Sequence, residues 1–235
     1  MPLTLGVLII GSLYWRNDGR ERWRKWRLTK RECSVRVPIQ YCRLSANKTY
    51  TMVFSDLPED RFGKAKVVQC KRRVRSVRDL ITGAEWLWSA EESGEQEDRV
   101  PRFRVCSPEH RISPRKKCWG CVALLKNPGK EVPQQLLDDW ARRVAAEAHY
   151  KADPLRLVDN GGMLQIPWPK LLDGNDVPID LLLATSNDRK PECPTVREIA
   201  DAWNQHPVVD YFRKNREKGI ETFQDAEVEN LLVRH

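Results

Sequence analysis

The stretch that decides the fold is LGVLIIGSLYW, residues 5–15. Its apolar start predicts a buried strand, and the run is far shorter than the roughly 20 apolar residues of a membrane span. Small residues then end the strand. Because glycine lets a ligand come close, and amides beyond a strand end have no ladder partner, this turn predicts an anion-binding site. Its members are Gly11, Ser12, Leu13 and Tyr14. The alternative is an ordinary strand exit.

Composition predicts a folded protein of one large domain, or one domain with an extension. Of the 235 residues, 40% are apolar and 31% are charged, which is typical of a globular chain. The seven cysteines are odd in number and show no repeating spacing, so we expect reduced thiols. Nothing basic precedes the first apolar run, so it does not read as a signal peptide. We therefore expect a cytoplasmic protein with no membrane segment.

Positive charge is concentrated in the first third of the chain. Residues 1–78 hold 19 Lys and Arg against 6 Asp and Glu, whereas the remainder holds 22 against 27. Two runs stand out, at 20–27 and 71–75, and the first contains tryptophans. Such runs bind nucleic acid through phosphate contacts and base stacking. The candidate nucleic-acid-binding residues are Arg22, Arg24, Arg27, Arg72 and Arg73.

A structural reading of the first basic run is the favoured alternative. Asp18 can cap a helix over residues 19–30, with Trp23 and Trp26 facing the core and the arginines solvated. Even then, a basic surface attracts anionic ligands, nucleic acid or a protein partner.

The remaining pattern predicts an α+β protein. We expect strands at 35–41, 49–54, 65–70, 118–125 and 179–184, and helices beginning at Ser76, Pro133 and Thr195. This order lacks regular βαβ alternation, so we expect a mixed or antiparallel curled sheet or small barrel with flanking helices, plus a C-terminal α+β extension. The predicted parts are residues 1–93, a charged loop or linker with prolines at 94–117, and residues 118–235, which pack on the first part or form a second lobe.

Residues 3–93 resemble the γ-glutamyl cyclotransferase-like family. The opening strand and Gly11-Ser12-Leu13 are similar to that family's first strand and its Tyr-Gly-Ser-Leu or Tyr-Gly-Ser-Asn turn. Residues 37–41 and 49–54 resemble its next strands. The family's catalytic glutamate, at the end of a helix, falls on Glu91. The chain departs from the pattern at Ile10, Trp88 and Glu92, where the family has tyrosine, aspartate and glycine.

This resemblance implies a metal-independent enzyme that releases 5-oxoproline from a small γ-glutamyl-type substrate. Backbone amides at the turn would stabilise the anion, and Glu91 would carry the proton. The alternative for Glu91 is a solvated helix end within the acidic cluster 91–95. The alternative function is a non-catalytic module, alone or within a larger bacterial assembly, that binds an anionic metabolite, a nucleotide or nucleic acid.

A second motif, Cys118-Trp119-Gly120-Cys121, has the spacing of a zinc or redox pair. Cys106 and His110 would complete a zinc site, but the spacing matches no familiar zinc fold. We therefore interpret Cys118 and Cys121 as buried thiols and expect no metal or cofactor.

Overall fold

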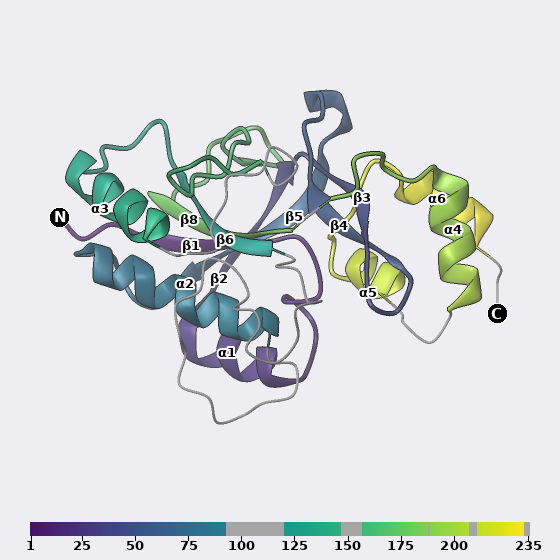
Figure 1. Ribbon diagram of the computed structural model, residues 1–235, viewed down its shortest axis with the longest axis horizontal. Coiled ribbons are helices and arrows are strands. Elements are labelled where there is room, and N and C mark those ends of the chain that lie inside the picture. The colour runs from purple at the N-terminus through teal and green to yellow at the C-terminus, as the bar shows by residue number, and fades with distance from the viewer. Residues whose placement is uncertain (93–119, 147–156, 188, 207–210, 233–235) are drawn as a thin grey trace.

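The computed structural model describes residues 1–92, 120–146, 157–187, 189–206 and 211–232. Within these residues the main sheet has six strands in the order β6-β8-β1-β5-β2-β7 (Figure 1). They are β1 (Leu5–Ile9), β2 (Leu28–Val37), β5 (Gly63–Cys70), β6 (Gly120–Lys126), β7 (Lys170–Leu171) and β8 (Leu181–Asn187). A separate two-stranded sheet contains β3 (Ile39–Leu44) and β4 (Tyr50–Phe54).

The opening apolar run forms the middle of the main sheet. Strand β1 is buried along its whole length, pairing in parallel with β8 on one side and antiparallel with β5 on the other. A strand covered on both faces needs apolar side chains at every position, which explains why the run does not alternate. The other pairings of the main sheet are antiparallel. The predicted mixed sheet is therefore confirmed.

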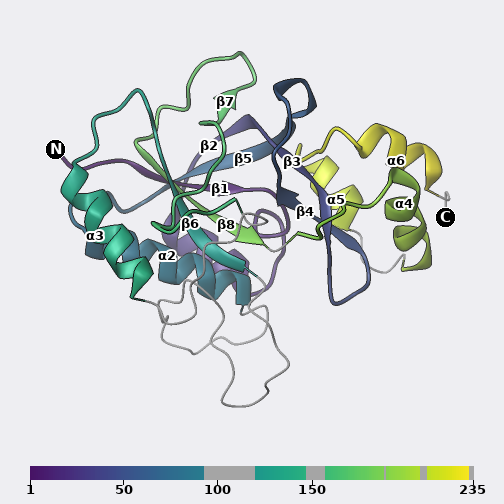
Figure 2. The ribbon, with the colours of Figure 1, turned by 45° about the horizontal axis from the view of Figure 1, so that its top comes forward.

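Helices cover one face of the main sheet. Helices α1 (Gly19–Arg27) and α2 (Val77–Glu92) lie below it in Figure 1, and α3 (Gln134–Ala145) packs beside α2 (Figure 2). The buried residues of α2 include Leu80, Ala84, Leu87 and Trp88. Gly83 lets the helix approach closely, since a Cβ there would lie 3.1 Å from Leu183 and 3.2 Å from Leu5.

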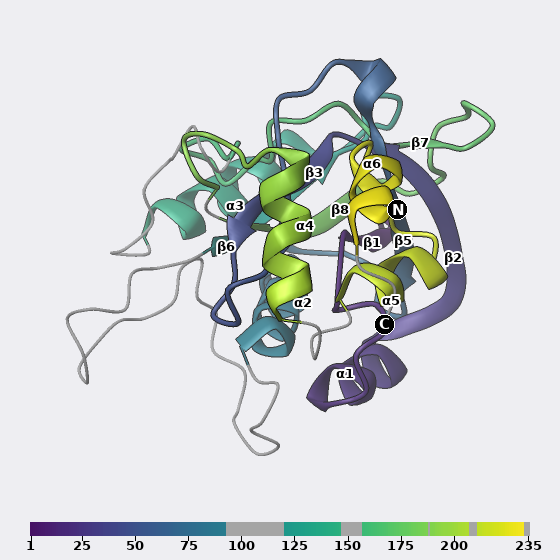
Figure 3. The same cartoon turned by 90° about the vertical axis from the view of Figure 1, so that its right-hand side faces the viewer.

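The C-terminal helices form a group at the other end of the molecule. Helices α4 (Val196–Gln205), α5 (Tyr211–Glu217) and α6 (Asp225–Leu231) lie beside the β3–β4 hairpin (Figure 3). A capping box starts α4, because the Thr195 hydroxyl accepts from the Glu198 amide and the Glu198 carboxylate accepts from the Thr195 amide. A short 3₁₀ turn, Glu59–Arg61, precedes β5.

Two predicted boundaries were wrong. The predicted strand 35–41 is broken at Pro38, because proline has no N–H to continue the ladder and the chain passes into the β3–β4 hairpin. The predicted helix 19–30, capped by Asp18 as expected, ends at Arg27. It ends there because Leu28 pairs with Cys70 of β5 and begins β2.

The prediction that both tryptophans of α1 are buried was half right. Trp23 is 5% exposed and belongs to the core, whereas Trp26 is 54% exposed. The guanidinium of Arg22 lies over the Trp26 ring, 4.1 Å from its centroid. One turn of helix therefore presents one indole to the core and another to solvent.

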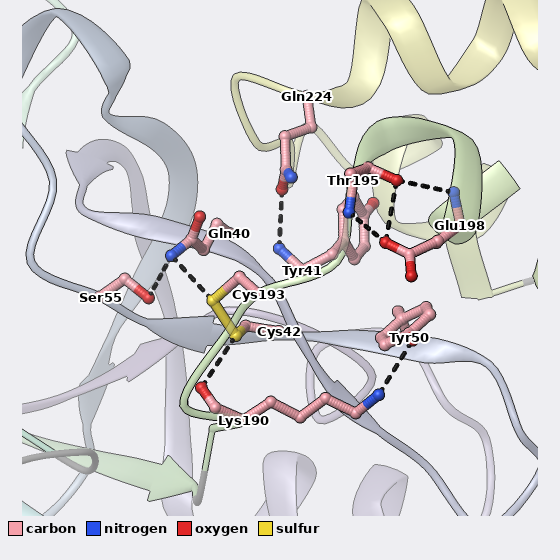
Figure 4. Close-up of a disulfide and its surroundings, with 10 residues drawn as sticks. All are labelled: Gln40, Tyr41, Cys42, Tyr50, Ser55, Lys190, Cys193, Thr195, Glu198 and Gln224. Atoms are coloured by element: carbon pink, nitrogen blue, oxygen red, sulfur yellow. Dashed lines mark hydrogen bonds between the residues drawn. A yellow bond between two sulfur atoms is a disulfide. The ribbon is translucent and has the colours of Figure 1, made fainter.

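The expectation of reduced thiols was wrong for one pair. Cys42 in β3 and Cys193, which precedes α4, form a disulfide across 151 residues of sequence (Figure 4). Gln40 stands beside it, with Nε2 donating to Ser55 Oγ at 2.8 Å and lying 3.3 Å from Cys193 Sγ. The spacing of the cysteines along the sequence could not predict this bond, because only the tertiary fold brings the two segments together.

The described residues are thus an α+β fold whose main sheet is shared by both halves of the chain. Strands β6 and β8, from the second half, extend the sheet beyond β1. The predicted linker, residues 94–117, lies outside the described residues, and the domain boundaries remain predictions.

Candidate active site

The parallel pairing of β1 with β8 creates the edge at which the candidate site lies. Leu8 is in register with Ala184, so Thr185 lies next to the end of β1. The carboxyl ends of parallel strands meet at one edge of a sheet, where ligands bind in many α/β proteins. The chain leaves β1 there in a tight turn, in which the Gly11 carbonyl accepts from the Tyr14 amide at 3.0 Å.

Three amides of this turn have no acceptor among the residues that the structure describes. Within the described residues, the N–H groups of Gly11, Ser12 and Leu13 donate no hydrogen bond. The Leu13 carbonyl is occupied, since Arg24 Nη1 donates to it at 2.6 Å. Gly11 and Leu13 are buried and Ser12 is half-buried. Buried amides without partners are costly, so this turn is suited to an anionic ligand.

Glu91 lies in the last turn of α2, where the sequence placed the candidate acid–base group. The residue keeps some exposed surface, yet its carboxyl lies deep enough that burial raises its pKa. The positive charges of Arg20 and Arg43 and the Thr185 hydroxyl oppose this rise. Arg20 also reaches the Glu91 backbone carbonyl, with Nη2 at 3.4 Å. A solvated helix end does not describe this carboxyl.

Thr185 connects Glu91 to the sheet edge. Its hydroxyl is buried and lies close enough to the Glu91 carboxyl to lower the pKa of that carboxyl. Among the described residues, this hydroxyl has no well-formed hydrogen bond. The C-terminal end of β8 therefore lies near the C-terminal end of α2, beside the turn that follows β1.

Tyr211, the first residue of α5, joins the turn to Glu91. A Cβ built at Gly11 would overlap the Tyr211 hydroxyl oxygen, so this hydroxyl lies directly over the turn. Burial raises the pKa of Tyr211 to about 12, and the charge of Glu91 adds to that rise. Tyr211 therefore keeps its proton at neutral pH and can donate a hydrogen bond to an anion.

Aromatic packing holds the Tyr211 ring in place. The ring stacks on Trp203 of α4 with centroids 5.8 Å apart, and meets Trp15 edge-on at 6.2 Å. Trp15 is itself fixed, because its Nε1 donates to Asn215 Oδ1 at 2.7 Å. The C-terminal helices are thereby locked to the turn that follows β1.

The other predicted residues lie in different surroundings. The Tyr14 hydroxyl donates to Glu32 Oε1 at 2.6 Å, and both burial and Glu32 raise its pKa, so Tyr14 is committed to a strand of the main sheet. Arg24 supports the turn, since it also donates to the Arg16 carbonyl at 2.9 Å. The remaining predicted basic residues, Arg22, Arg27, Arg72 and Arg73, lie around α1 and the loop after β5.

Sequence reasoning missed the members of the site from the second half of the chain. Neither Thr185 nor Tyr211 belongs to a recognisable sequence motif. The only signal for each was expected burial: Thr185 follows the apolar run of β8, and Tyr211 is followed by the aromatic Phe212. Arg20 was noted only as part of the basic run 20–27, and Arg43 was not singled out. Two hollows on the surface lie away from the site, one between α5 and α6 and one beside α1.

The proposed metal alternative finds no support in the described residues. They contain no group of three or more His, Cys, Asp or Glu placed to hold a metal ion. Cys121 is buried in β6, as predicted. Cys106, His110 and Cys118 lie outside the described residues.

We compared the chain with family models, curated proteins and solved structures, and none of them matched. The likeness to γ-glutamyl cyclotransferases therefore remains a prediction. Within the described part of the chain, no helix combines the length and apolar character that a membrane crossing requires.

Proposed function

We propose that this protein catalyses the intramolecular aminolysis of a γ-glutamyl-type amide and releases 5-oxoproline. One observation carries the proposal: the Tyr211 hydroxyl lies directly over the turn that contains the three amides, and the charge of Glu91, whose pKa is raised, acts on the same tyrosine. A proton carrier and anion-stabilising donors are the two components that this reaction needs.

The proposed reaction begins with Glu91 ionised. The α-amine of the substrate attacks its own γ-carbonyl carbon, forming a C–N bond, and Glu91 takes the proton that the nitrogen loses. The carbonyl electron pair moves onto oxygen. The C–N bond to the leaving amine then breaks, and Glu91 returns the proton to that amine. A raised pKa suits both transfers, because it brings the pKa of the carboxyl closer to the pKa values of the amines with which it exchanges the proton.

The turn and Tyr211 stabilise negative charge in this proposal. The amides of Gly11, Ser12 and Leu13 are fixed donors, and fixed donors stabilise an oxyanion without reorganising during the reaction. The protonated Tyr211 hydroxyl is a further donor beside them. The substrate α-carboxylate and the developing oxyanion are the two anionic groups that these donors would share.

The test is the release of 5-oxoproline from a panel of γ-glutamyl amines and γ-glutamyl peptides. Glu91→Gln keeps the shape and removes the proton carrier, so we expect turnover to fall roughly 10²- to 10⁴-fold with little change in substrate affinity. Glu59→Gln, at an exposed site, is the matched control and should keep wild-type turnover. Equal turnover in Glu91→Gln and wild type would reject the assignment.

A second candidate function is anion binding without catalysis, through the same turn or through the basic N-terminal surface. The juxtaposition of the two basic runs favours it, since the Lys71 amide donates to the Arg27 carbonyl at 2.8 Å. Salt-dependent binding of a polyanion, in a protein inactive on the whole γ-glutamyl panel, would select this function.

Cytoplasmic location is part of the leading proposal. Disulfides are more typical of oxidising compartments, so the Cys42–Cys193 bond argues against it. Redox state in cells, measured by alkylation of the two cysteines, tests this.

A further inference from the structure

The two basic runs, residues 20–27 and 71–75, form one surface in the folded protein. Besides the Lys71 backbone bond, Lys71 Nζ donates to the Lys25 carbonyl at 2.5 Å. The C-terminal end of α1 is thereby fixed beside the loop that follows β5. We call this surface the basic–aromatic face. Its members are Arg22, Trp26, Arg27, Arg72, Arg73 and Trp86.

Two indole–guanidinium pairs belong to this face, one within α1 and one between α1 and α2. The Arg22 guanidinium covers Trp26 at 4.1 Å, and the Arg27 guanidinium covers Trp86 at 3.8 Å. Trp26 is 54% exposed and Trp86 is half-buried, at the edge of a shallow hollow that Arg72 and Arg73 also line. Aromatic and guanidinium planes of this kind are the surfaces on which unpaired bases stack.

Positive charge on this face exceeds what the described residues neutralise. Arg22, Arg27 and Arg73 form no ion pair with any residue in the described ranges. Arg72 pairs with Asp79 at 2.8 Å, but that carboxylate also accepts from the amides of Arg75 and Ser76. The pKa of Arg27 is lowered by burial and by the charge of Arg72, so two like charges stand close together. A polyanion would relieve this repulsion.

We propose that the basic–aromatic face binds single-stranded nucleic acid, with its arginines on the phosphates and Trp26 and Trp86 as platforms for the bases. The inference rests on the second proposed function and names its site and partner. A duplex keeps its bases stacked inside, so it would engage the arginines but not the indoles. Arg24 is not part of the face, because it is bound to carbonyls of the turn.

The experiment measures the binding of a labelled oligothymidylate to the full chain across a salt series. We expect Trp26→Ala to weaken binding about 5- to 150-fold and to leave the melting temperature unchanged, because the ring is exposed. Arg22→Ala and Arg73→Ala should each weaken binding and reduce the slope of log affinity against log salt by about 0.7.

The chain offers a matched control pair. Arg61 lies over Phe223, which is 38% exposed, on another part of the surface. Arg61→Ala and Phe223→Ala remove the same kind of contact and should leave oligothymidylate binding within twofold of wild type.

Competition with heparin and with duplex DNA separates the outcomes. Preference for the single strand together with dependence on Trp26 supports the inference. Equal binding of all three polyanions, unchanged by Trp26→Ala, overturns the single-strand site while leaving the second proposed function in place. Absence of binding to any of them at low salt overturns both.

Discussion

The hydroxyl of Tyr211 occupies the space that a side chain at Gly11 would fill. These residues are 200 positions apart, and their contact brings helix α5 onto the turn after β1. The glycine is therefore required by a close approach of a side chain, and the approach places a protonated phenol directly over the turn.

Gly11→Ala should disturb the site through this contact. The added methyl group meets the Tyr211 hydroxyl, and overpacking of this kind costs about 1–3 kcal/mol of stability. We expect loss of 5-oxoproline release with a modest fall in the melting temperature. Tyr211→Phe removes the oxygen, so the stability cost of Gly11→Ala should shrink in the Tyr211→Phe background. A double-mutant cycle measures this, and strictly additive costs would show that the two residues do not meet.

Activity should depend on pH through Glu91. Burial raises the pKa of Glu91 above the usual 4.5. Because the proposed base must be ionised, kcat/KM should rise with pH, and the midpoint of this rise should lie above pH 4.5. Thr185→Val removes a hydroxyl that lowers the pKa of Glu91, and should move this limb to higher pH. Thr29→Val, in a different strand, serves as the control. An acid limb at the same pH in Thr185→Val would contradict the assigned role of Thr185.

Stability should depend on pH through Asp225. The side chain and amide of Thr222 donate to its Oδ1, but burial raises its pKa to about 6 from 3.8. The folded state then binds more protons than the unfolded state between these values, so this carboxyl lowers stability progressively as pH rises from about 4 to about 6.

Asp225→Asn does not titrate, and it provides the comparison. The free energy of unfolding of wild type should fall relative to that of Asp225→Asn by up to about 3 kcal/mol across this pH range. Denaturant titrations at a series of pH values measure the difference. A difference that stays constant with pH would mean that Asp225 has an ordinary pKa.

Reduction should loosen the C-terminal helices. The Cys42–Cys193 bond closes a long loop, and loss of such a bond costs about 2–5 kcal/mol. We expect a reductant to lower the melting temperature of wild type, and a variant with both cysteines replaced by serine to melt at the reduced value with no response to reductant. Cys33→Ser, outside the disulfide, should respond like wild type. Peptide mapping without reductant should recover Cys42 and Cys193 in one linked species, and its absence would contradict the bond.

Local sequence was sufficient to predict the elements whose cause is local. The apolar run before Gly11 determined a buried strand, Asp18 determined the start of α1, and the Thr195–Glu198 pair determined the start of α4. The position of Glu91 at the end of a helix came from the family resemblance, and the structure has it in the last turn of α2. The buried strand and the two helix starts depend on neighbours within a few residues, so their physical causes are present in the sequence itself.

Tertiary structure decided everything that depends on residues far apart. Pairing of β1 with β8 placed Thr185 at the turn, and docking of α5 placed Tyr211 over Gly11. The same kind of contact chose which tryptophan of α1 was buried and joined two cysteines separated by 151 residues. No local pattern carries this information, because packing between distant segments is chosen by the shape and chemistry of the whole core rather than by the spacing of residues along the chain.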